Sequence, residues 1–450
     1  MKARSTFSSK LGFVLAAAGS AVGLGNIWRF PYLAAKYGGG MFLLIYLIFV
    51  FTFGFTLMIA ETAIGRKTGL SPIGAFRKLN KKYTFIGVIA SFVAFLILPY
   101  YSVIGGWVVK YLITYVTGGH AAAAGGEFFN SFIASPIQPM ILQSLFLIAC
   151  AVVIIRGVKN GVERVSRILM PVLVLLSIAI AIYSITLPGA VEGVKYFLIP
   201  DFSRFSIQAV LAALGQMFYS MSLAMGIMIT YGSYLRKEDD LEKGVSNIEL
   251  FDTGIAFLAG LMIIPAVFAF SGNDPAALNQ GPGLMFVTLP KVFETMGLSS
   301  IIGCLFFLLV LFAALTSAIS LLEAIVSTVC DEFHISRAKA TIIMTAIAIV
   351  MGIPSSLGFG LWSDFQILGM SILDFFDFIT NAVLMPIGAL LTCIFVGYIL
   401  KVNVITGEVK LSSSFKREKL FTIMVQYIAP ICILAILVSS ILNAFGIITL

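Results

Sequence analysis

A run of residues suited to binding an ion and a zwitterion interrupts the first hydrophobic segment. It reads Gly19-Ser20-Ala21-Val22-Gly23-Leu24-Gly25-Asn26-Ile27-Trp28-Arg29-Phe30-Pro31. Glycine weakens a helix interior by about 1 kcal/mol relative to alanine. A freed backbone group in hydrocarbon costs several kcal/mol unless it has a partner. We therefore expect the helix to break here, and its loose carbonyl and N–H groups to hold a cation and a small zwitterion.

A second hydrophobic segment carries a similar interruption, Gln216-Met217-Phe218-Tyr219-Ser220-Met221-Ser222-Leu223-Ala224-Met225-Gly226. Small residues in either run could instead serve close helix packing, as in a GxxxG motif. The two runs, however, begin the first and the second set of five predicted helices. Interrupted helices in corresponding positions of two halves are typical of the binding site of an inverted-repeat transporter.

Two carboxylates lie in or near otherwise apolar segments. Asp252 falls inside a predicted span, where an ionised carboxylate needs a cation or hydrogen bonds, unless the helix end there is ragged and wet. Glu61 lies near the end of the second span. It could face water, or it could point inward and accept hydrogen bonds from unwound backbone.

Other residues suggest chemistry less strongly. Tyr101 could line a pocket or simply pack, and the hydroxyls of residues 313–320 could bind an ion or bond the preceding helical turn. Gly161 and Pro171, ten residues apart, could let the inner end of the fifth helix unwind, or could be helix punctuation.

The composition indicates that the segments carrying these residues lie in a membrane. The 450 residues are 60% hydrophobic and 11% charged, with a mean hydropathy of +1.04, which predicts an all-α polytopic membrane protein. We predict eleven transmembrane helices, at residues 11–35, 39–65, 83–117, 139–155, 162–187, 205–235, 248–271, 298–330, 337–353, 368–400 and 420–448.

The net charge of +8 follows from topology and does not suggest nucleic acid as a partner. With a cytoplasmic N-terminus, only Lys195, Arg204 and Lys291 fall in predicted outer segments, so most basic residues lie inside. This pattern predicts an extracellular C-terminus and a protein of the cell inner (plasma) membrane, embedded in its lipid bilayer. Basic residues followed by an apolar run at the start of the chain are similar to a signal peptide. Polar and charged residues follow within the same apolar run, however, which favours a transmembrane helix. The five cysteines show no disulfide or metal spacing.

The predicted organisation is a 5+5 inverted repeat with unwound helices 1 and 6, and residues 118–139 as a loop. Its segments are an N-terminal gate segment (1–10), a first repeat (11–187), an extracellular loop (188–204), a second repeat (205–400) with an extracellular lid at about 274–296, a cytoplasmic loop (401–419) and helix 11 (420–450).

The first interruption, continued by Tyr32 and by Lys36-Tyr37-Gly38-Gly39-Gly40, resembles the first-helix signature of the neurotransmitter:sodium symporters. The helix 6 run, Leu315-Thr316-Ser317 and Thr288-Leu289-Pro290 agree with it. The predicted number of eleven spans is similar to that of many bacterial members of the family, particularly those that carry hydrophobic or aromatic amino acids. The resemblance implies the leucine-transporter-type fold, which is an established inverted-repeat example.

The resemblance also implies two sodium ions as cofactors. The first site would use the Ala21 carbonyl, Asn26, Ser220 and Asp252, the last being Asn in many relatives. The second would use the carbonyls of Gly19, Val22 and Ala313 and the hydroxyls of Thr316 and Ser317. Oxygen ligands suit such a hard cation.

The implied substrate is an α-amino acid, because Gly23 leaves space for a carboxylate where monoamine carriers have an acidic residue. Leu24 and Gly25 N–H groups and Tyr101 would bind that carboxylate. The carbonyls of Ala21 and Tyr219 and the Ser222 hydroxyl would meet the amino group. Ile97, Met225 and Leu321 would line the side-chain pocket, the Tyr219 ring would cover it, and Ser220 would also contact the substrate.

The implied gates lie on either side of this pocket. Arg29 and Asp374 would form the outer gate, with Asp377 as a rival partner one turn on. Arg4, Ser233, Tyr234 and Asp331 would form the inner gate, with an Arg4–Asp331 ion pair.

The resemblance therefore implies a sodium-coupled symporter of neutral hydrophobic or aromatic L-amino acids, which we expect to be a monomer or weak dimer. Because Asp252 supplies a fixed negative charge at the first sodium site, we expect transport to be independent of chloride. An ion channel and a substrate-sensing membrane protein are the alternatives. No paired catalytic residues or metal spacing suggest an enzyme.

Overall fold

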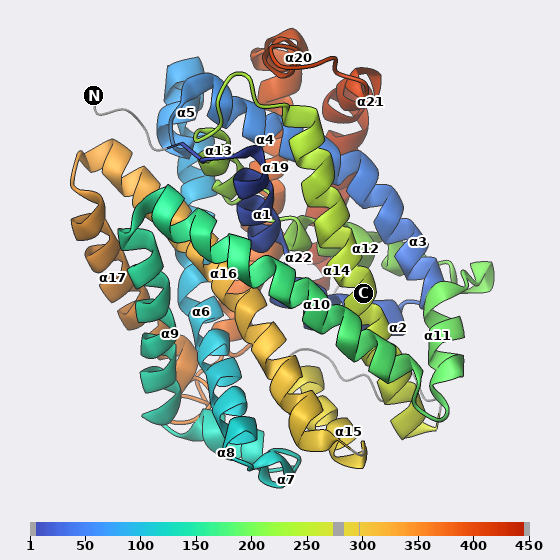
Figure 1. Ribbon diagram of the computed structural model, residues 1–450. Helices are drawn as coiled ribbons and strands as arrows, with labels where there is room; N and C mark the ends of the chain where they lie inside the picture. The colour runs from blue at the N-terminus through green and yellow to red at the C-terminus, as the bar shows by residue number, and fades with distance from the viewer. Residues whose placement is uncertain (1–5, 273–282, 297, 445–450) are drawn as a thin grey trace.

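The computed structural model describes residues 6–272, 283–296 and 298–444, and over these ranges the chain forms helices and two isolated β-bridges but no strand. Arg4, the start of the predicted lid and the last residues of helix 11 lie outside the described residues. Figure 1 shows a bundle of long helices that surround α1 (Lys10–Ala21).

Nine described helices are long and apolar enough to cross a membrane, and a bent pair at residues 10–36 makes a tenth. They are Gly40–Thr68 (α3, Gly40–Phe49, to α4, Phe55–Thr68), Lys81–Val116 (mainly α6, Thr84–Val116), Gln138–Ile155 (α9), Val158–Ile185 (mainly α10, Arg164–Ile185), Leu241–Ser271 (α14), Ser299–Phe333 (α16), Arg337–Leu357 (α17), Ile372–Ile399 (α18, Ile372–Asp377, to α19, Met385–Ile394) and Glu418–Leu442 (α21, Glu418–Ile423, to α22, Ala429–Ala444).

The predicted sixth helix is shorter than the others. It consists of α12 (Ile207–Ser220) and the six-residue α13 (Ile227–Gly232). Close packing positions α13 against α4: a Cβ atom at Gly65 would lie 2.0 Å from the Ile229 carbonyl oxygen, and one at Gly232 would lie 2.3 Å from the Thr62 carbonyl oxygen. Only glycine allows this contact, which fixes one side of the break between α12 and α13.

Several segments that were predicted as loops contain short helices. Residues 118–139 contain α7 (His120–Ala123) and α8 (Phe128–Ala134), so the prediction of a loop there was wrong. The predicted loops at 188–204 and 401–419 contain α11 (Ala190–Leu198) and α20 (Val402–Val409). These helices lie at the ends of the bundle, where short amphipathic segments can pack on the tips of the long helices (Figure 1).

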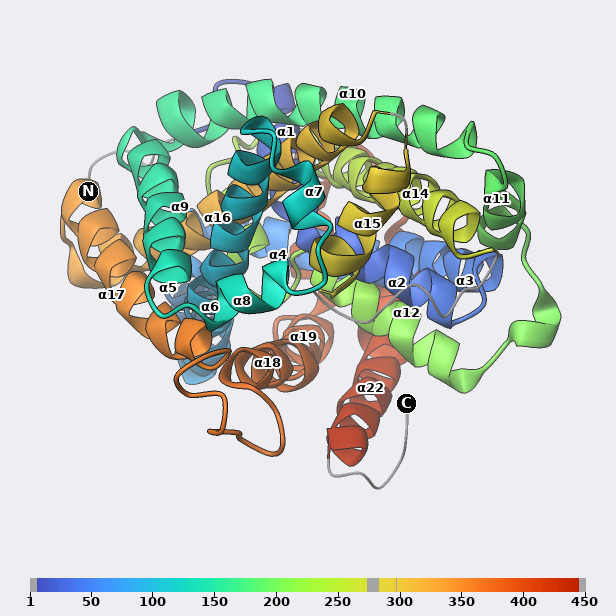
Figure 2. The ribbon, with the colours of Figure 1, turned by 90° about the horizontal axis from the view of Figure 1, so that it is seen from below.

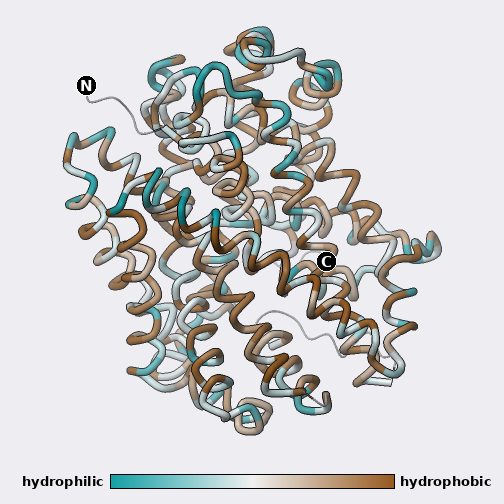
Figure 3. The backbone as a smooth tube through the Cα atoms, viewed as in Figure 1, coloured by the Kyte–Doolittle hydropathy of each residue, from teal (hydrophilic) through white to brown (hydrophobic). Residues whose placement is uncertain are grey.

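The two ends of the bundle differ in character. We call the end that holds the start of the chain, α5 (Pro72–Leu79), α20 and α21 the N-terminal face, and the end that holds α7, α8 and α15 (Leu289–Thr295) the opposite face (Figure 1). Hydrophobic colour covers most of the helix lengths in Figure 3, and hydrophilic colour gathers toward the ends. The described part of the predicted lid packs on the opposite face, where the Tyr111 hydroxyl donates to the Phe286 carbonyl at 2.6 Å.

A buried ion-pair cluster holds the N-terminal face together. The Arg66 side chain is fully buried, and its Nε donates to Glu408 Oε1 at 3.0 Å. Its Nη1 donates to the Asp239 carbonyl at 2.6 Å, and Lys237 Nζ contacts the same Glu408 oxygen at 2.7 Å. The cluster therefore joins the end of α4, the segment before α14, and α20.

Replacing Arg66 with alanine should lower the free energy of unfolding by about 3–5 kcal/mol, because it leaves the buried Glu408 carboxylate without its main partner. The measurement is the thermal unfolding midpoint of the purified protein in detergent. The matched control is Arg77→Ala, since the Arg77 side chain is 46% exposed and its pair with Glu332 should contribute about 0–1 kcal/mol. Equal shifts in the two variants would contradict this prediction.

Candidate functional site between two broken helices

The first helix breaks where the sequence places its glycines. Residue Val22 has extended backbone angles (φ −72°, ψ 102°) at the end of α1, and the helix resumes at Gly25. The segment Gly25–Lys36, which ends in α2 (Phe30–Lys36), is tilted by 54° from α1. Carbonyl groups at the end of α1 and N–H groups at the start of the next segment are therefore available near the middle of the bundle.

The second break separates α12 from α13 at residues 221–226. Ser222, Ala224 and Gly226 all have positive φ angles, of 53°, 59° and 73°. Glu61, on α4, lies inside the bundle, and its Oε1 accepts a hydrogen bond from the Ala224 N–H at 2.7 Å. The buried carboxylate thus supplies the acceptor that the unwound backbone lacks.

A first cluster of polar groups lies where the two breaks meet α14. Asp252 Oδ1 accepts from Asn26 Nδ2 at 2.7 Å and from the Ser220 hydroxyl at 2.8 Å. The Tyr46 hydroxyl donates to Asp252 Oδ2 at 3.2 Å, and Asn26 Oδ1 accepts from the Gly23 N–H at 3.0 Å. The structure thus brings together three of the residues predicted for the first sodium site and adds Tyr46, which the sequence did not single out. The carboxylate and hydroxyl oxygens suit a hard cation, whereas Asn26 turns its amide nitrogen toward them and its oxygen accepts from Gly23.

A second cluster joins α1 to α16. The Ser317 hydroxyl lies 3.4 Å from the Gly19 carbonyl oxygen, 3.0 Å from that of Ser20 and 3.2 Å from that of Val22. The Thr316 hydroxyl lies 3.1 Å from the Ala313 carbonyl oxygen. Three of the five residues predicted for the second sodium site, Gly19, Val22 and Ser317, thus meet between α1 and α16. The Thr316 hydroxyl instead donates to the Phe312 and Ala313 carbonyls in the preceding turn of its own helix.

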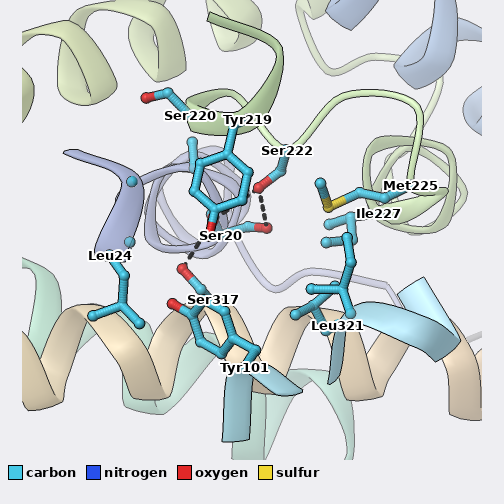
Figure 4. A pocket seen from close by; sticks show the side chains of 14 residues that line it. Ser20, Leu24, Tyr101, Tyr219, Ser220, Ser222, Met225, Ile227, Ser317 and Leu321 are labelled. Atoms are coloured by element: carbon cyan, nitrogen blue, oxygen red, sulfur yellow. Dashed lines mark hydrogen bonds between the residues drawn. The ribbon is translucent and has the colours of Figure 1, made fainter. Parts of the chain in front are cut away.

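A small cavity lies between the breaks and the long helices α6 and α16 (Figure 4). All eleven residues that the sequence assigned to substrate contact line it, and Ser20, Ile227 and Ser317 complete the lining. The eleven are Ala21, Gly23, Leu24, Gly25, Ile97, Tyr101, Tyr219, Ser220, Ser222, Met225 and Leu321.

The cavity has a polar end and an apolar end. Figure 4 shows the Tyr101 and Ser317 side chains close together, and Met225, Ile227 and Leu321 gathered on the other side. The buried Tyr101 hydroxyl lies close to the Ser317 hydroxyl and the Leu24 N–H but forms no hydrogen bond of good geometry with the described residues. It is therefore available to a polar group that enters the cavity.

Two glycines shape the polar end of the cavity. A Cβ atom at Gly23 would lie 2.6 Å from Ser317 Oγ and 3.2 Å from the Tyr101 hydroxyl. A Cβ atom at Gly25 would lie 2.6 Å from the Tyr219 ring. A side chain at either position would therefore collide with the groups that close the cavity.

The opposite-face side of the cavity is closed by an aromatic ring and a cation. The Arg29 guanidinium lies 5.0 Å from the centre of the Tyr219 ring. Arg29, Asp374 and Asp377 all line a hollow beyond this ring. Among the described residues, Arg29 forms no ion pair within 4.0 Å, so the structure does not join Arg29 and Asp374 directly. Asp377, which accepts from Asn381 Nδ2 at 2.6 Å, lies within electrostatic range of Arg29.

The N-terminal-face side of the cavity holds the residues predicted for the inner gate, except Arg4, which lies outside the described residues. Asp331 Oδ2 accepts from the Ser71 N–H at 2.9 Å. The Tyr234 hydroxyl donates to Glu323 Oε1 at 2.6 Å, and the Ser233 hydroxyl donates to the Thr230 carbonyl. Glu323 also pairs with Arg337, so this side is tied to α16 and α17.

Gly161 and Pro171 lie in one helix next to α1. Gly161 belongs to a π-helical turn, Val158–Glu163, and a Cβ atom there would lie 2.0 Å from the Val153 carbonyl oxygen. Pro171 lies inside α10. The N-terminal segment packs on the same turn, since Glu163 Oε2 accepts from the Ser8 N–H at 2.8 Å.

The fold and the site define a polytopic helical membrane protein with a buried cavity between two broken helices. A family model described as the sodium:neurotransmitter symporter family matches residues 4–132 and 134–447. The chain therefore belongs to this family of sodium-coupled transporters, which confirms the resemblance seen in the sequence.

Individual relatives agree with this assignment. The chain is 38% identical over 450 residues to an uncharacterized sodium-dependent transporter of Bacillus subtilis, YhdH, and the alignment covers 98% of both chains. It is 28% identical over 384 residues to the human sodium- and chloride-dependent GABA transporter 2, covering 75% of this chain and 64% of that one. The crystal structure of MhsT in complex with L-phenylalanine has 43% identity and a TM-score of 0.89, covering 97% of this chain and 100% of that one.

Proposed function

We propose that this protein is a symporter that imports neutral hydrophobic or aromatic L-amino acids together with two sodium ions, without a requirement for chloride. The observation that carries the proposal is the cavity itself: its polar end borders both oxygen clusters, and its other end is apolar. Ser220 belongs to the cavity and to the first cluster, and Ser317 to the cavity and to the second. The solved relative with L-phenylalanine supports this class of substrate.

The substrate would lie with its carboxylate at the polar end. The N–H groups of Leu24 and Gly25 begin a helical segment whose positive dipole end favours an anion, and the unpartnered Tyr101 hydroxyl faces the same space. The amino group would meet the carbonyls of Ala21 and Tyr219 and the Ser222 hydroxyl. The side chain would then extend toward the apolar end, formed by Ile97, Met225, Ile227 and Leu321.

Each ion would stabilise a contact between α1 and another helix. The first would hold the break at Asn26 against Ser220 and Asp252, and the second would hold Gly19 and Val22 against Thr316 and Ser317. One charge moved down 100 mV releases about 2.3 kcal/mol, and a tenfold gradient adds about 1.4 kcal/mol. Two ions therefore supply about 7 kcal/mol, enough for about 10⁵-fold accumulation of a neutral substrate.

The proposed topology has eleven spans in a 5+5 inverted repeat, in which α1 with α2 and α12 with α13 each form one broken span. The N-terminal face would be cytoplasmic, since most Lys and Arg residues lie on that side of the predicted spans. The opposite face, and the C-terminus, would then be outside the inner membrane.

We propose Asp377 rather than Asp374 as the partner of Arg29 in the outer gate. Asp377 is held in place by Asn381 and by the Tyr100 hydroxyl at 3.3 Å, whereas Asp374 is exposed and bonds with Ser371 on its own helix. Asp377→Asn should therefore raise the apparent KM for the amino acid by about tenfold, the effect of about 1.4 kcal/mol, while Asp374→Asn changes it less than twofold. Uptake kinetics of the two variants measure this, and the reverse order would contradict the assignment.

The test of the whole proposal is uptake of labelled phenylalanine and leucine into proteoliposomes. Saturable uptake that requires an inward sodium gradient, and persists when gluconate replaces chloride, supports it. Sodium current without substrate uptake would favour a channel, and sodium-dependent binding without either would favour a sensor. Competition by the twenty amino acids then defines which side chain the cavity prefers.

A further inference from the structure

The loop between α17 and α18, residues 358–371, presents four large apolar side chains to the surroundings. Leu361 is 72% exposed, Trp362 45%, Phe365 59% and Leu368 57%. Asp364 is the one charged residue in this loop. Exposed apolar groups gathered on a short segment are typical of contact with lipid or with another protein.

The backbone of this loop is ordered by its own hydrogen bonds. The Trp362 N–H donates to the Leu357 carbonyl at 2.9 Å, and Ile367 and Met370 exchange two hydrogen bonds of 3.0 Å. This pair closes a tight turn in which Leu368 has φ 53° and Gly369 has φ 74°. A bulky residue in the left-handed region is uncommon. Here it places Leu368 at the exposed tip of the turn.

The loop also has a fixed position on the bundle. A Cβ atom at Gly360 would lie 2.3 Å from the Ala134 carbonyl oxygen, so the loop packs closely on the end of α8. In Figure 2 the orange loop projects sideways from the bundle, beyond α17 and α18, and in Figure 1 it does not extend past α7 and α8. The loop therefore reaches outward at the level of the helix ends, and not away from the membrane.

The surface next to the loop also carries exposed apolar residues. Ile137, three residues after Ala134, is 61% exposed, and Ile141 on α9 is 54% exposed. Val350 on α17 is 63% exposed. Exposed apolar side chains therefore occur both on the loop and on α9 and α17, two helices long and apolar enough to cross a membrane.

We propose that this loop is a membrane anchor, with Leu361, Trp362, Phe365 and Leu368 inserted among the lipids of the leaflet at the opposite face, which is the outer leaflet in the orientation proposed above. Tryptophan and other large apolar side chains favour the boundary between headgroups and acyl chains. The anchor leads directly into α18, which carries Asp374 and Asp377. Lipid contact at this loop would therefore hold the start of α18 in place beside the hollow that Arg29 lines.

The chain offers a direct fluorescence test, because Trp28 and Trp107 are 8% and 1% exposed, whereas Trp362 is exposed. The full protein and its Trp362→Phe variant are reconstituted in phosphatidylcholine vesicles, and the difference between their emission spectra reports Trp362. Lipids brominated near the carbonyl end of the acyl chain should quench this difference emission, and lipids brominated near the methyl end should quench it less. Aqueous iodide should have little effect.

Two results would overturn the anchor. One is a difference emission that iodide quenches and neither brominated lipid affects, which would leave the loop in water. The other is protection from both quenchers that disappears as the protein is diluted in lipid, which would identify a second copy as the occupant.

A second variant checks the insertion without removing the reporter. The triple substitution Leu361→Ser, Phe365→Ser and Leu368→Ser should weaken quenching by the shallow brominated lipid and expose Trp362 to iodide. Phe202→Ser, at a residue 70% exposed in another loop, is the matched control and should leave both signals unchanged. Quenching that is equal in the triple variant and the control would count against the anchor. None of these readouts depends on transport.

Discussion

Replacing Asp252 with asparagine is expected to lower sodium-dependent amino-acid uptake by at least about 100-fold, the effect of about 3 kcal/mol that follows when one partner of a buried charge interaction is removed. The Asp252 carboxylate is fully buried and accepts from Asn26, Ser220 and Tyr46. Its charge offsets that of the ion proposed for this cluster. Asparagine keeps the shape of the side chain and removes the charge, so the ion site should weaken while the fold persists.

The same variant tests the role of chloride. The proposed chloride independence rests on the fixed negative charge of Asp252, so uptake by the unmodified protein should be equal in chloride and gluconate. In Asp252→Asn a mobile anion can restore part of the missing charge, and chloride should stimulate the remaining uptake. A strict chloride requirement in the unmodified protein would contradict this account.

Glu249→Gln is a suitable control because Glu249 is a buried carboxylate on the same helix, but its Oε2 accepts from Arg417 at 2.9 Å, away from the cavity. The Glu249→Gln substitution should lower the stability of the protein more than it lowers sodium-dependent uptake. Uptake by both variants is compared at matched amounts of folded protein, which size-exclusion chromatography measures.

The sequence predicts the broken helices well because the breaks depend on local chemistry. Glycine and serine runs at 19–25 and 220–226 are unfavourable in a continuous apolar helix, and the structure breaks the helices at Val22 and after Ser220. The lining of the cavity is predicted from the resemblance to the symporter family, because residues such as Ile97, Tyr101 and Leu321 lie on unbroken helices and carry no local signal. The structure also decides between the two alternatives for Glu61. The carboxylate points inward and accepts a hydrogen bond from the unwound N–H of Ala224.

Other features depend on distances between remote segments, which a single sequence does not encode visibly. Tyr46 contacts Asp252 across 206 residues, and one tyrosine among many apolar residues gives no sign of that. Asp374 and Asp377 lie one turn apart on α18, so the choice between them depends on the position of α18 along its own axis relative to Arg29. Four short helices lie at the ends of the bundle: α7, α8, α11 and α20. Their hydrophobic patterns cover too few residues to distinguish them from loops.

Gly23→Ala is expected to raise the apparent Kd for a bound amino acid by about 10- to 100-fold, which corresponds to the 1–3 kcal/mol typical of an overpacked interior. The added Cβ atom would lie 2.6 Å from Ser317 Oγ and 3.2 Å from the Tyr101 hydroxyl. Ser317 cannot easily retreat, because its hydroxyl already contacts the carbonyls of Ser20 and Val22. The methyl group must therefore disturb the second oxygen cluster or occupy space proposed for the substrate carboxylate.

Binding of a labelled amino acid to the purified protein, measured over a range of sodium concentrations, separates these two effects. Loss of carboxylate space weakens substrate binding at every sodium concentration, whereas displacement of Ser317 shifts the sodium dependence itself. Gly254→Ala is the matched control, since no atom lies within 4 Å of its added Cβ and the residue is within α14. If Gly23→Ala bound the amino acid as tightly as the control, the substrate carboxylate could not lie beside Gly23, and the proposed orientation of the substrate in the cavity would have to be reversed.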